Sequence, residues 1–196
     1  MEKPVAEVTR FMQAIVPNCR AAAEEFCSHL HLRELQPDEF FVREGQVCRH
    51  VGFLQSGMIR HYYTNANEEV TRWMSLEGEF VTALSSFIQS SPSNHHLQAI
   101  NRCTLWVIER EVWQQLYARH ESLRELWLRL LELNVIGFED RLYQQLSGDA
   151  EQRYLYFLKN YPRLLEKVPQ KYIASMIGIK AESLSRVRAK LGKRIS

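Results

Sequence analysis

The sequence predicts an α+β fold that combines a small β-roll, one long helix and a pair of short helices near the C-terminus. Short segments rich in Val, Ile, Phe and Tyr alternate with turn sequences between residues 34 and 109, which indicates strands. Apolar residues recur at helical spacing from 121 to 147, and basic residues concentrate after 163. The chain has 196 residues, 45% hydrophobic and 24% charged, so it can bury the core of one or two domains.

Two short helices are expected before the strands. The first covers residues 4–16 and stops at Pro17, and the second runs over residues 18–30. The strands that follow are short and closely spaced, which is typical of a jelly-roll-like β-roll, also called a double-stranded β-helix. Gly45 and Gly57 lie in turn sequences, where we expect them to adopt positive φ angles.

The helix predicted over 121–147 follows a shorter one over 110–119 and has two apolar faces. Two apolar faces need two partners, so one face is expected to cover the roll and the other to pair with a second copy of the chain. The alternative is a helix buried within one subunit. An asparagine near the middle of the pairing face is expected to fix the register. The expected dimer interface consists of Leu123, Trp127, Leu130, Leu131, Asn134 and Phe138.

Charge is distributed unevenly along the chain. Residues 163–196 contain nine Lys or Arg and two Glu, a net charge of +7, which leaves −5 for the remaining residues. This asymmetry favours a small basic module that binds a polyanion, attached to a larger acidic body. The alternative is a solvated basic tail.

The segment from Pro169 to Leu191 has the pattern of a helix-turn-helix. The motif needs a small residue where its helices cross, which is Ala174, and a glycine at the turn, which is Gly178. Asp149 is a plausible N-cap for the helix that precedes the motif, and the Gly148-Asp149 step is the expected domain boundary and hinge. The positions that must be buried are Ile173, Ile177, Ile179, Leu184 and Val187. A plain helical hairpin is the alternative.

The second helix of the motif has an outward face. At 100° per residue from the buried Leu184, the side chains of Glu182 and Arg186 point away from the core. In a helix-turn-helix this face enters the major groove, so Arg186 is expected to bind guanine and Glu182 to accept from cytosine or to orient Arg186. The further expected DNA contacts, chiefly to phosphate, are Lys171, Lys180, Ser183, Ser185, Lys190 and Lys193.

Several motifs together resemble the Crp/Fnr family of bacterial transcription regulators. They are Glu44-Gly-Gln-Val-Cys-Arg49, Phe53-Leu-Gln-Ser-Gly-Met-Ile-Arg60, Glu77-Gly-Glu-Phe80, Pro169-Gln-Lys-Tyr-Ile-Ala174 and Glu182-Ser-Leu-Ser-Arg186. The resemblance implies a cyclic-nucleotide-binding-like roll with N-terminal helices over 1–120, a dimerisation helix and hinge over 121–148, and a helix-turn-helix domain over 149–196. Ala181 replaces the family's common first arginine, and the wing between Leu165 and Gln170 is expected to be reduced or missing.

The resemblance also implies a ligand pocket, which this sequence has altered. Where cyclic-nucleotide-binding members have a glutamate and an arginine, this chain has Ala83 and Ser93. We therefore expect a vestigial pocket and no useful binding of cyclic AMP, because losing two charged partners weakens a ligand by orders of magnitude. A different effector, or none, remains open. The residues expected at this pocket are Ala83, Leu84, Ser93 and Asn94, and His95, His96 and Arg102 either line it or lie in exposed loops.

No cofactor or metal is expected. The four cysteines, Cys19, Cys27, Cys48 and Cys103, lie far apart and are expected to be reduced thiols. No apolar run is long enough to span a membrane, so a cytoplasmic protein is expected. A cupin-like metalloenzyme is an alternative, but adjacent histidines on one strand point to opposite faces and cannot share a metal. The chain is therefore not expected to be an enzyme.

The sequence predicts a homodimeric transcription regulator that binds double-stranded DNA at an inverted repeat. RNA polymerase is a further partner that the resemblance allows, and no membrane partner is expected. The alternative function is a regulatory or scaffold module whose basic C-terminal part binds protein. An affinity for duplex DNA that falls steeply with salt and depends on the base sequence would distinguish the regulator from the scaffold module.

Overall fold

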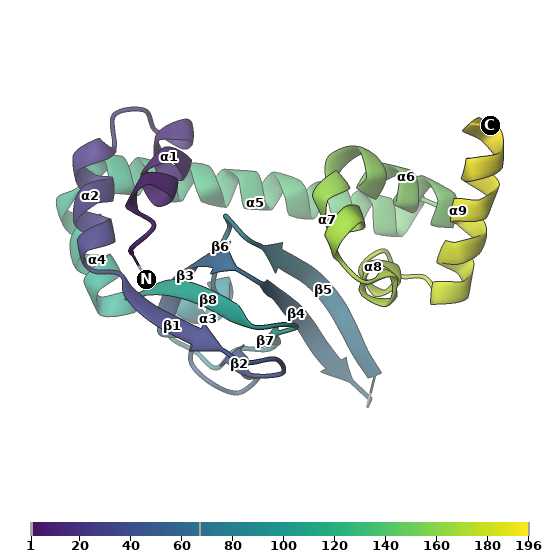
Figure 1. The fold of residues 1–196 in the computed structure, drawn as a ribbon, viewed down its shortest axis with the longest axis horizontal. Coiled ribbons are helices and arrows are strands. Elements are labelled where there is room, and N and C mark those ends of the chain that lie inside the picture. Colours follow the sequence, from purple (N-terminus) through teal and green to yellow (C-terminus); the bar gives the residue numbers. More distant parts are fainter. Residues whose placement is uncertain (1, 67, 196) are drawn as a thin grey trace.

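The computed structural model describes residues 2–66 and 68–195, with side chains as far as Leu191 in the last helix. One long helix runs the length of the molecule, with the two N-terminal helices at one end, the C-terminal helices at the other and the roll alongside it (Figure 1). This is the predicted α+β fold. No helix in the described ranges is long and apolar enough to cross a lipid bilayer.

The predicted N-terminal helices are present. They are α1 (Val5–Ile15) and α2 (Arg20–Ser28), and they lie side by side next to the roll (Figure 1). Met12 and Phe26 are buried in the same core as the strands. These helices therefore form one wall of the main core.

Two four-stranded antiparallel sheets make the roll. One has the order β1 (His31–Leu35), β8 (Cys103–Glu109), β3 (His50–Ser56) and β6 (Phe80–Val81). The other has the order β2 (Phe40–Val42), β7 (His96–Ala99), β4 (Met58–Asn65) and β5 (Glu68–Leu76), and the short helix α3 (Leu84–Gln89) follows β6.

Two predicted turn glycines have the expected backbone. The φ angles of Gly45 and Gly57 are +83° and +99°. Gly57 also lies too close to its neighbours for a side chain, since a Cβ there would lie 2.6 Å from the Sγ of Cys103. The turn between β3 and β4 therefore requires glycine on both grounds.

Helix α5 (Glu121–Ser147) follows α4 (Arg110–Arg119) and has the predicted bounds. At 1.5 Å per residue it is about 40 Å long, enough to pass beyond the roll. One face of its first half is buried in the main core, in contact with α1 and α4, and Leu123 and Leu126 on this face are 0% and 3% exposed. The expectation that Leu123 belongs to a dimer interface is wrong, because this side chain has no surface left for a second copy.

The C-terminal part contains four helices. They are α6 (Ala150–Asn160), α7 (Pro162–Lys167), α8 (Gln170–Met176) and α9 (Ala181–Ile195). As predicted, Asp149 is the N-cap of α6, and it forms a reciprocal capping box with Gln152. In the described part of the chain no strand follows β8, so α7 and α8 are joined without a wing.

The C-terminal helices share a hydrophobic core with the roll. Met74 and Leu76 of β5 are buried in one cluster with Ile173, Ala174 and Leu184. Figure 1 shows α8 facing β5. The hinge expected at Gly148-Asp149 thus joins two parts that are also in contact through a buried apolar interface.

Candidate functional site

Helices α8 and α9 form a helix-turn-helix built on the predicted residues. Ala174 is buried at the crossing, and Gly178 has a φ angle of +69° in the turn. The amide of Ile179 donates to the carbonyl of Ala174 at 3.0 Å, which closes the turn. Ile177 and Leu184 are buried, whereas Val187 is half-buried against the same cluster. The pair is therefore locked at a fixed angle.

The outward face of α9 carries the predicted reading residues. Glu182 and Arg186 are both exposed, and neither forms an ion pair within the described residues. Ser185 is exposed and donates to the carbonyl of Ala181 at 3.2 Å, whereas Ser183 is half-buried. An unpaired arginine and an unpaired carboxylate are thus available to an incoming ligand.

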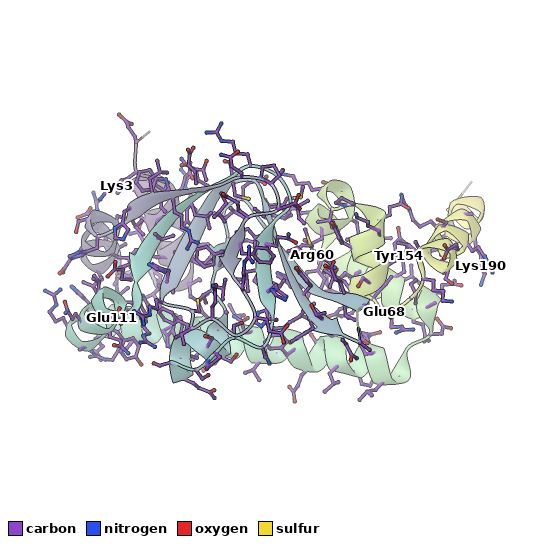
Figure 2. The ribbon with its side chains drawn as sticks, turned by 90° about the horizontal axis from the view of Figure 1, so that it is seen from below. Lys3, Arg60, Glu68, Glu111, Tyr154 and Lys190 are labelled. Carbon is purple, nitrogen blue, oxygen red and sulfur yellow. The ribbon has the colours of Figure 1, made fainter. Side chains whose placement is uncertain are left out.

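The predicted phosphate-binding lysines differ in their surroundings. Lys171 and Lys180 are exposed. Lys190, at the far end of the molecule in Figure 2, pairs with Glu151 of α6 at 2.5 Å. A phosphate contact by Lys190 would therefore have to replace that pair. The side chain of Lys193 lies outside the described residues.

A polar network fastens α8 to β5. The Oγ of Ser175 accepts a hydrogen bond of 2.8 Å from the backbone amide of Thr71, a buried strand residue. Arg60 of β4 is buried at this junction (Figure 2), where its guanidinium carbon lies 4.6 Å from the ring centroid of Tyr172. Its charge is balanced by Glu69 at 2.5 Å. Sequence periodicity contained no signal for this network, because its partners are about a hundred residues apart.

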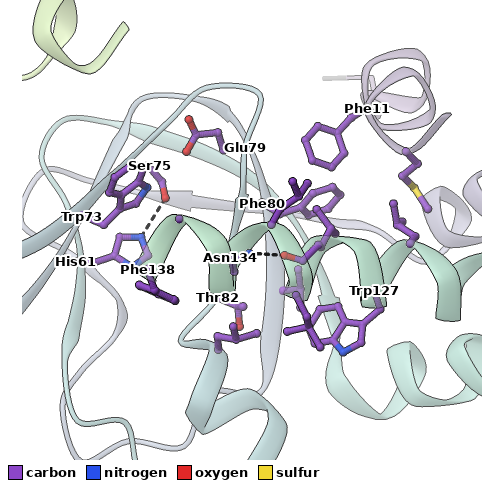
Figure 3. A pocket seen from close by; sticks show the side chains of 18 of the residues that line it. Phe11, His61, Trp73, Ser75, Glu79, Phe80, Thr82, Trp127, Asn134 and Phe138 are labelled. Carbon is purple, nitrogen blue, oxygen red and sulfur yellow. Dashed lines mark hydrogen bonds between the residues drawn. The ribbon is translucent and has the colours of Figure 1, made fainter. Parts of the chain in front are cut away.

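A cavity of about 400 Å³ lies between the roll and α5 (Figure 3). Of the residues expected at the vestigial pocket, only Leu84 lines it. Ala83 is buried beside it, Ser93 donates to the carbonyl of His95 at 2.7 Å, and Asn94 is exposed. The expected set is therefore not gathered around this cavity, whose lining comes mainly from α5 and, after it, from β5.

The histidines near the cavity are not exposed loop residues. His95 is 1% exposed and stacks on His61, with ring centroids 6.1 Å apart. The Nε2 of His61 is 3.0 Å from the Oγ of Ser75, which also lines the cavity. Burial lowers the pKa of His95 to about 4 and lowers that of His61, so both rings are neutral at physiological pH. Arg102, in contrast, is exposed and pairs with Glu34.

The surroundings of the cysteines do not favour thiol reactivity. All four cysteines are buried and unpaired. Burial raises the pKa of Cys27 and of Cys103 to about 11, which keeps these thiols protonated and unreactive. Among the described residues there is no group of three or more side chains arranged to hold a metal ion.

The fold and the α8–α9 pair define a class of protein, namely a β-roll joined through a long helix to a helix-turn-helix. Residues 32–120 match the family model of the cyclic nucleotide-binding domain. No curated protein matches the sequence.

Solved structures with the same arrangement include three regulators. FixK2 from Bradyrhizobium japonicum has 18% identity and a TM-score of 0.71, with 84% of this chain and 85% of that chain covered. The c-di-GMP responsive global regulator CLP of Xanthomonas campestris has 22% identity and a TM-score of 0.67, with 89% and 92% covered. A CooA mutant from Carboxydothermus hydrogenoformans has 15% identity and a TM-score of 0.69, with 85% and 78% covered.

Residues 32–120 are thus similar to cyclic nucleotide-binding domains, and the chain as a whole has the fold of the Crp/Fnr transcription regulators. At these identities the structural likeness shows the fold. FixK2, CLP and CooA are transcription regulators rather than enzymes.

Proposed function

We propose that this protein is a transcription regulator that binds double-stranded DNA through α9. The main supporting observation is the exposed, unpaired face of Glu182 and Arg186 on a rigid helix-turn-helix. In this motif the N-terminal part of the second helix reads base edges in the major groove. Arg186 would bind guanine with two hydrogen bonds, and Lys171 and Lys180 would neutralise phosphates.

We further propose that two chains pair along α5. Exposed apolar residues repeat every seven positions at Leu128, Val135 and Leu142, and Leu131 and Phe138 fall between them in alternating steps of three and four. This is the seam of a two-stranded coiled coil. Trp127 and Leu130, which the sequence placed on the seam, pack partly against the roll.

Asn134 lies beside this seam. It is exposed, and its amide donates to the carbonyl of Leu130 at 2.8 Å. To fix the register of the dimer, as the sequence analysis predicts, the Asn134 amide would have to give up this bond to Leu130 when the two α5 helices pair. Dimerisation would place two α9 helices about 34 Å apart, which matches successive major grooves of an inverted repeat.

Cyclic AMP is not the expected effector in this proposal. Ala83 and Ser93 cannot supply the two charged contacts that the resemblance requires, and Ser93 is already bonded to the carbonyl of His95. A calorimetric titration is expected to show no low-micromolar binding of cyclic AMP. Binding in that range would contradict this part of the proposal.

Selection of bound duplexes from a random pool tests the proposal directly. The selected sequences are expected to contain an inverted repeat, and their affinity is expected to fall steeply as salt rises. Weak binding that is equal for all sequences would instead favour a scaffold module whose basic end binds protein. A chain that remains monomeric at micromolar concentration would contradict the dimer.

A further inference from the structure

We propose that the cavity between the roll and α5 binds a small apolar carboxylic acid, with its carboxylate held by Arg72 and Arg141. The binding site is formed by side chains of one chain, although Leu131 and Phe138 of its lining also lie on the seam proposed for the dimer. The role of the ligand as an effector rests on the proposed function.

The body of the cavity is apolar. Its volume of about 400 Å³ falls in the range of sites for small organic ligands. Figure 3 shows Phe11, Phe80 and Trp127 around one end of it. Further apolar side chains of the lining are Met12, Phe26, Trp113, Leu126 and Leu130. Burial of an aliphatic or aromatic group against these side chains would be favourable, because it removes apolar surface from water.

Three uncharged polar side chains of the lining are already hydrogen-bonded within the protein. The hydroxyl of Ser75 is bonded to His61, that of Thr82 donates to the carbonyl of His50 at 3.0 Å, and the amide of Asn134 donates to Leu130. A ligand rich in hydroxyls or base nitrogens would find few free partners and would lose its own hydrogen bonds to water. This chemistry disfavours a nucleotide and favours a hydrocarbon body.

Two arginines at the other end lack a counter-charge. The guanidinium carbons of Arg72 and Arg141 each lie 4.8 Å from the ring centroid of Phe138, and that of Arg141 lies 4.5 Å from Trp73. Both side chains are half-buried, and in the described part of the chain neither forms an ion pair. Arg141 makes one hydrogen bond, from Nε to the carbonyl of Gly137 at 3.1 Å. Partly buried cations without a carboxylate are costly, so the site selects an anion.

The other titratable groups of the cavity do not supply that anion. His61 is neutral because burial lowers its pKa, and the charges of Arg72 and Arg141 lower it further. Burial raises the pKa of Glu79, which lines the cavity, to about 7, and the charges that act on it are those of Arg163 and Glu77. Glu79 therefore gives up its charge readily and is not the partner of either cavity arginine.

The site also touches the C-terminal part. Trp73, beneath Arg141, packs edge-on against Tyr161 with ring centroids 5.1 Å apart, and Tyr161 lies between α6 and α7. A carboxylate that draws Arg141 off Trp73 would alter this contact. Occupancy would then change how the helix-turn-helix is held against the roll, which is a route for regulation.

Isothermal titration calorimetry of the full-length protein, without DNA, tests the site. The probes are dodecanoate, dodecanol and cyclic AMP, and dodecanoate is expected to bind once per chain and at least about tenfold more tightly than dodecanol. Equal binding of the alcohol and the acid would overturn the proposal, since the arginines would then contribute nothing. Tighter binding of cyclic AMP than of dodecanoate would overturn the ligand class.

Two variants and a matched control test whether the carboxylate binds at Arg72 and Arg141. Arg72→Gln and Arg141→Gln are each expected to weaken dodecanoate about tenfold, with partial recovery in Arg141→Lys. Arg43→Gln is the control, because Arg43 stacks on Phe40 at 4.2 Å in a similar way but outside the cavity. An equal loss in Arg43→Gln, or no loss in either cavity variant, would reject the site. The comparison of acid with alcohol needs no variant, so it stands even where a substitution unfolds the chain.

The outcome is separable from that of the DNA-binding proposal. If the protein binds dodecanoate but no duplex is selected from the random pool, the ligand site is supported and only its proposed role in regulating DNA binding is rejected. If an inverted repeat is selected but dodecanoate does not bind, the DNA-binding proposal is supported and the ligand site is rejected.

Discussion

Side chains on α9 and just before it are proposed to have two different roles, namely reading bases and neutralising phosphates. Arg186 is exposed on the outward face near the start of the helix, whereas Lys180 precedes the helix. A guanidinium can form two hydrogen bonds to guanine, and an ammonium contacts phosphate as a point charge. Substitutions at the two positions should therefore differ in kind as well as in size.

Arg186→Ala is expected to cost about 1 to 3 kcal/mol of binding free energy and to relax specificity at one position of each half-site. Lys180→Ala, the control, is expected to weaken all duplexes alike and to reduce the salt slope by about 1. Fluorescence anisotropy on the selected duplex and on single-base variants measures both effects. Identical, sequence-independent losses would contradict the assigned roles.

Glu79 makes stability depend on pH in an unusual direction. Burial raises its pKa to about 7 in the folded state, above that of a carboxyl in the unfolded chain, so the folded state binds a proton more tightly. Its contribution to stability is complete below the unfolded pKa and is lost as pH rises through about 7. His95, whose pKa falls to about 4, has the opposite slope, with stability lost as pH falls.

Comparison of Glu79→Gln with the natural protein isolates this effect. The difference in unfolding free energy, from urea melts at pH 5 and pH 8, is expected to favour the variant increasingly at the higher pH. The histidines contribute equally to both proteins and cancel. A difference that does not change with pH would show that the carboxyl is solvated in the folded state.

At the level of elements, the contact between α8 and β5 holds the helix-turn-helix in place. Its apolar part consists of Met74 and Leu76 against Ile173 and Ala174. Its polar part includes the hydrogen bond from the Thr71 amide to Ser175, a donor that would otherwise be buried without a partner.

Ser175→Ala is expected to destabilise the protein by about 1 to 3 kcal/mol, the cost of leaving a buried amide unsatisfied. Urea unfolding measures the loss, and hydrogen exchange of the Thr71 amide is expected to accelerate. Ser185→Ala is the matched control, because that exposed hydroxyl bonds only to a carbonyl of its own helix. Equal effects of the two substitutions would mean that the contact between α8 and β5 adds little to stability.

At the level of the whole molecule, the seam on α5 is expected to control both assembly and DNA binding. Leu142 is 58% exposed in the single chain, beyond the part of α5 that the roll covers. A charge there would be buried without a partner in the dimer but would be solvated in the monomer.

Leu142→Glu is therefore expected to shift the chain toward the monomer in sedimentation velocity and to abolish tight binding to an inverted repeat. Ile88→Glu is the control, because Ile88 is 52% exposed on α3 and is not one of the seam residues. Dimers that persist unchanged in Leu142→Glu would place the interface elsewhere.

Much of this molecule followed from short-range patterns. The bounds of α4 and α5, the cap at Asp149 and the positive φ of Gly178 were predictable because each depends on residues within one or two helical turns. The roll was predictable as a class because its strands are short and closely spaced. The reading face of α9 followed from the same periodicity.

Packing between distant segments determined the rest. Which face of α5 enters the main core, and hence the burial of Leu123, depends on helices α1 and α4 that pack against it, whereas periodicity marks only that two faces are apolar. Likewise Arg72 and Arg141 meet at Phe138 although they are far apart in sequence. Helical and strand periods are local properties of the backbone, but a cavity forms where elements leave space between them, and no local pattern encodes that space.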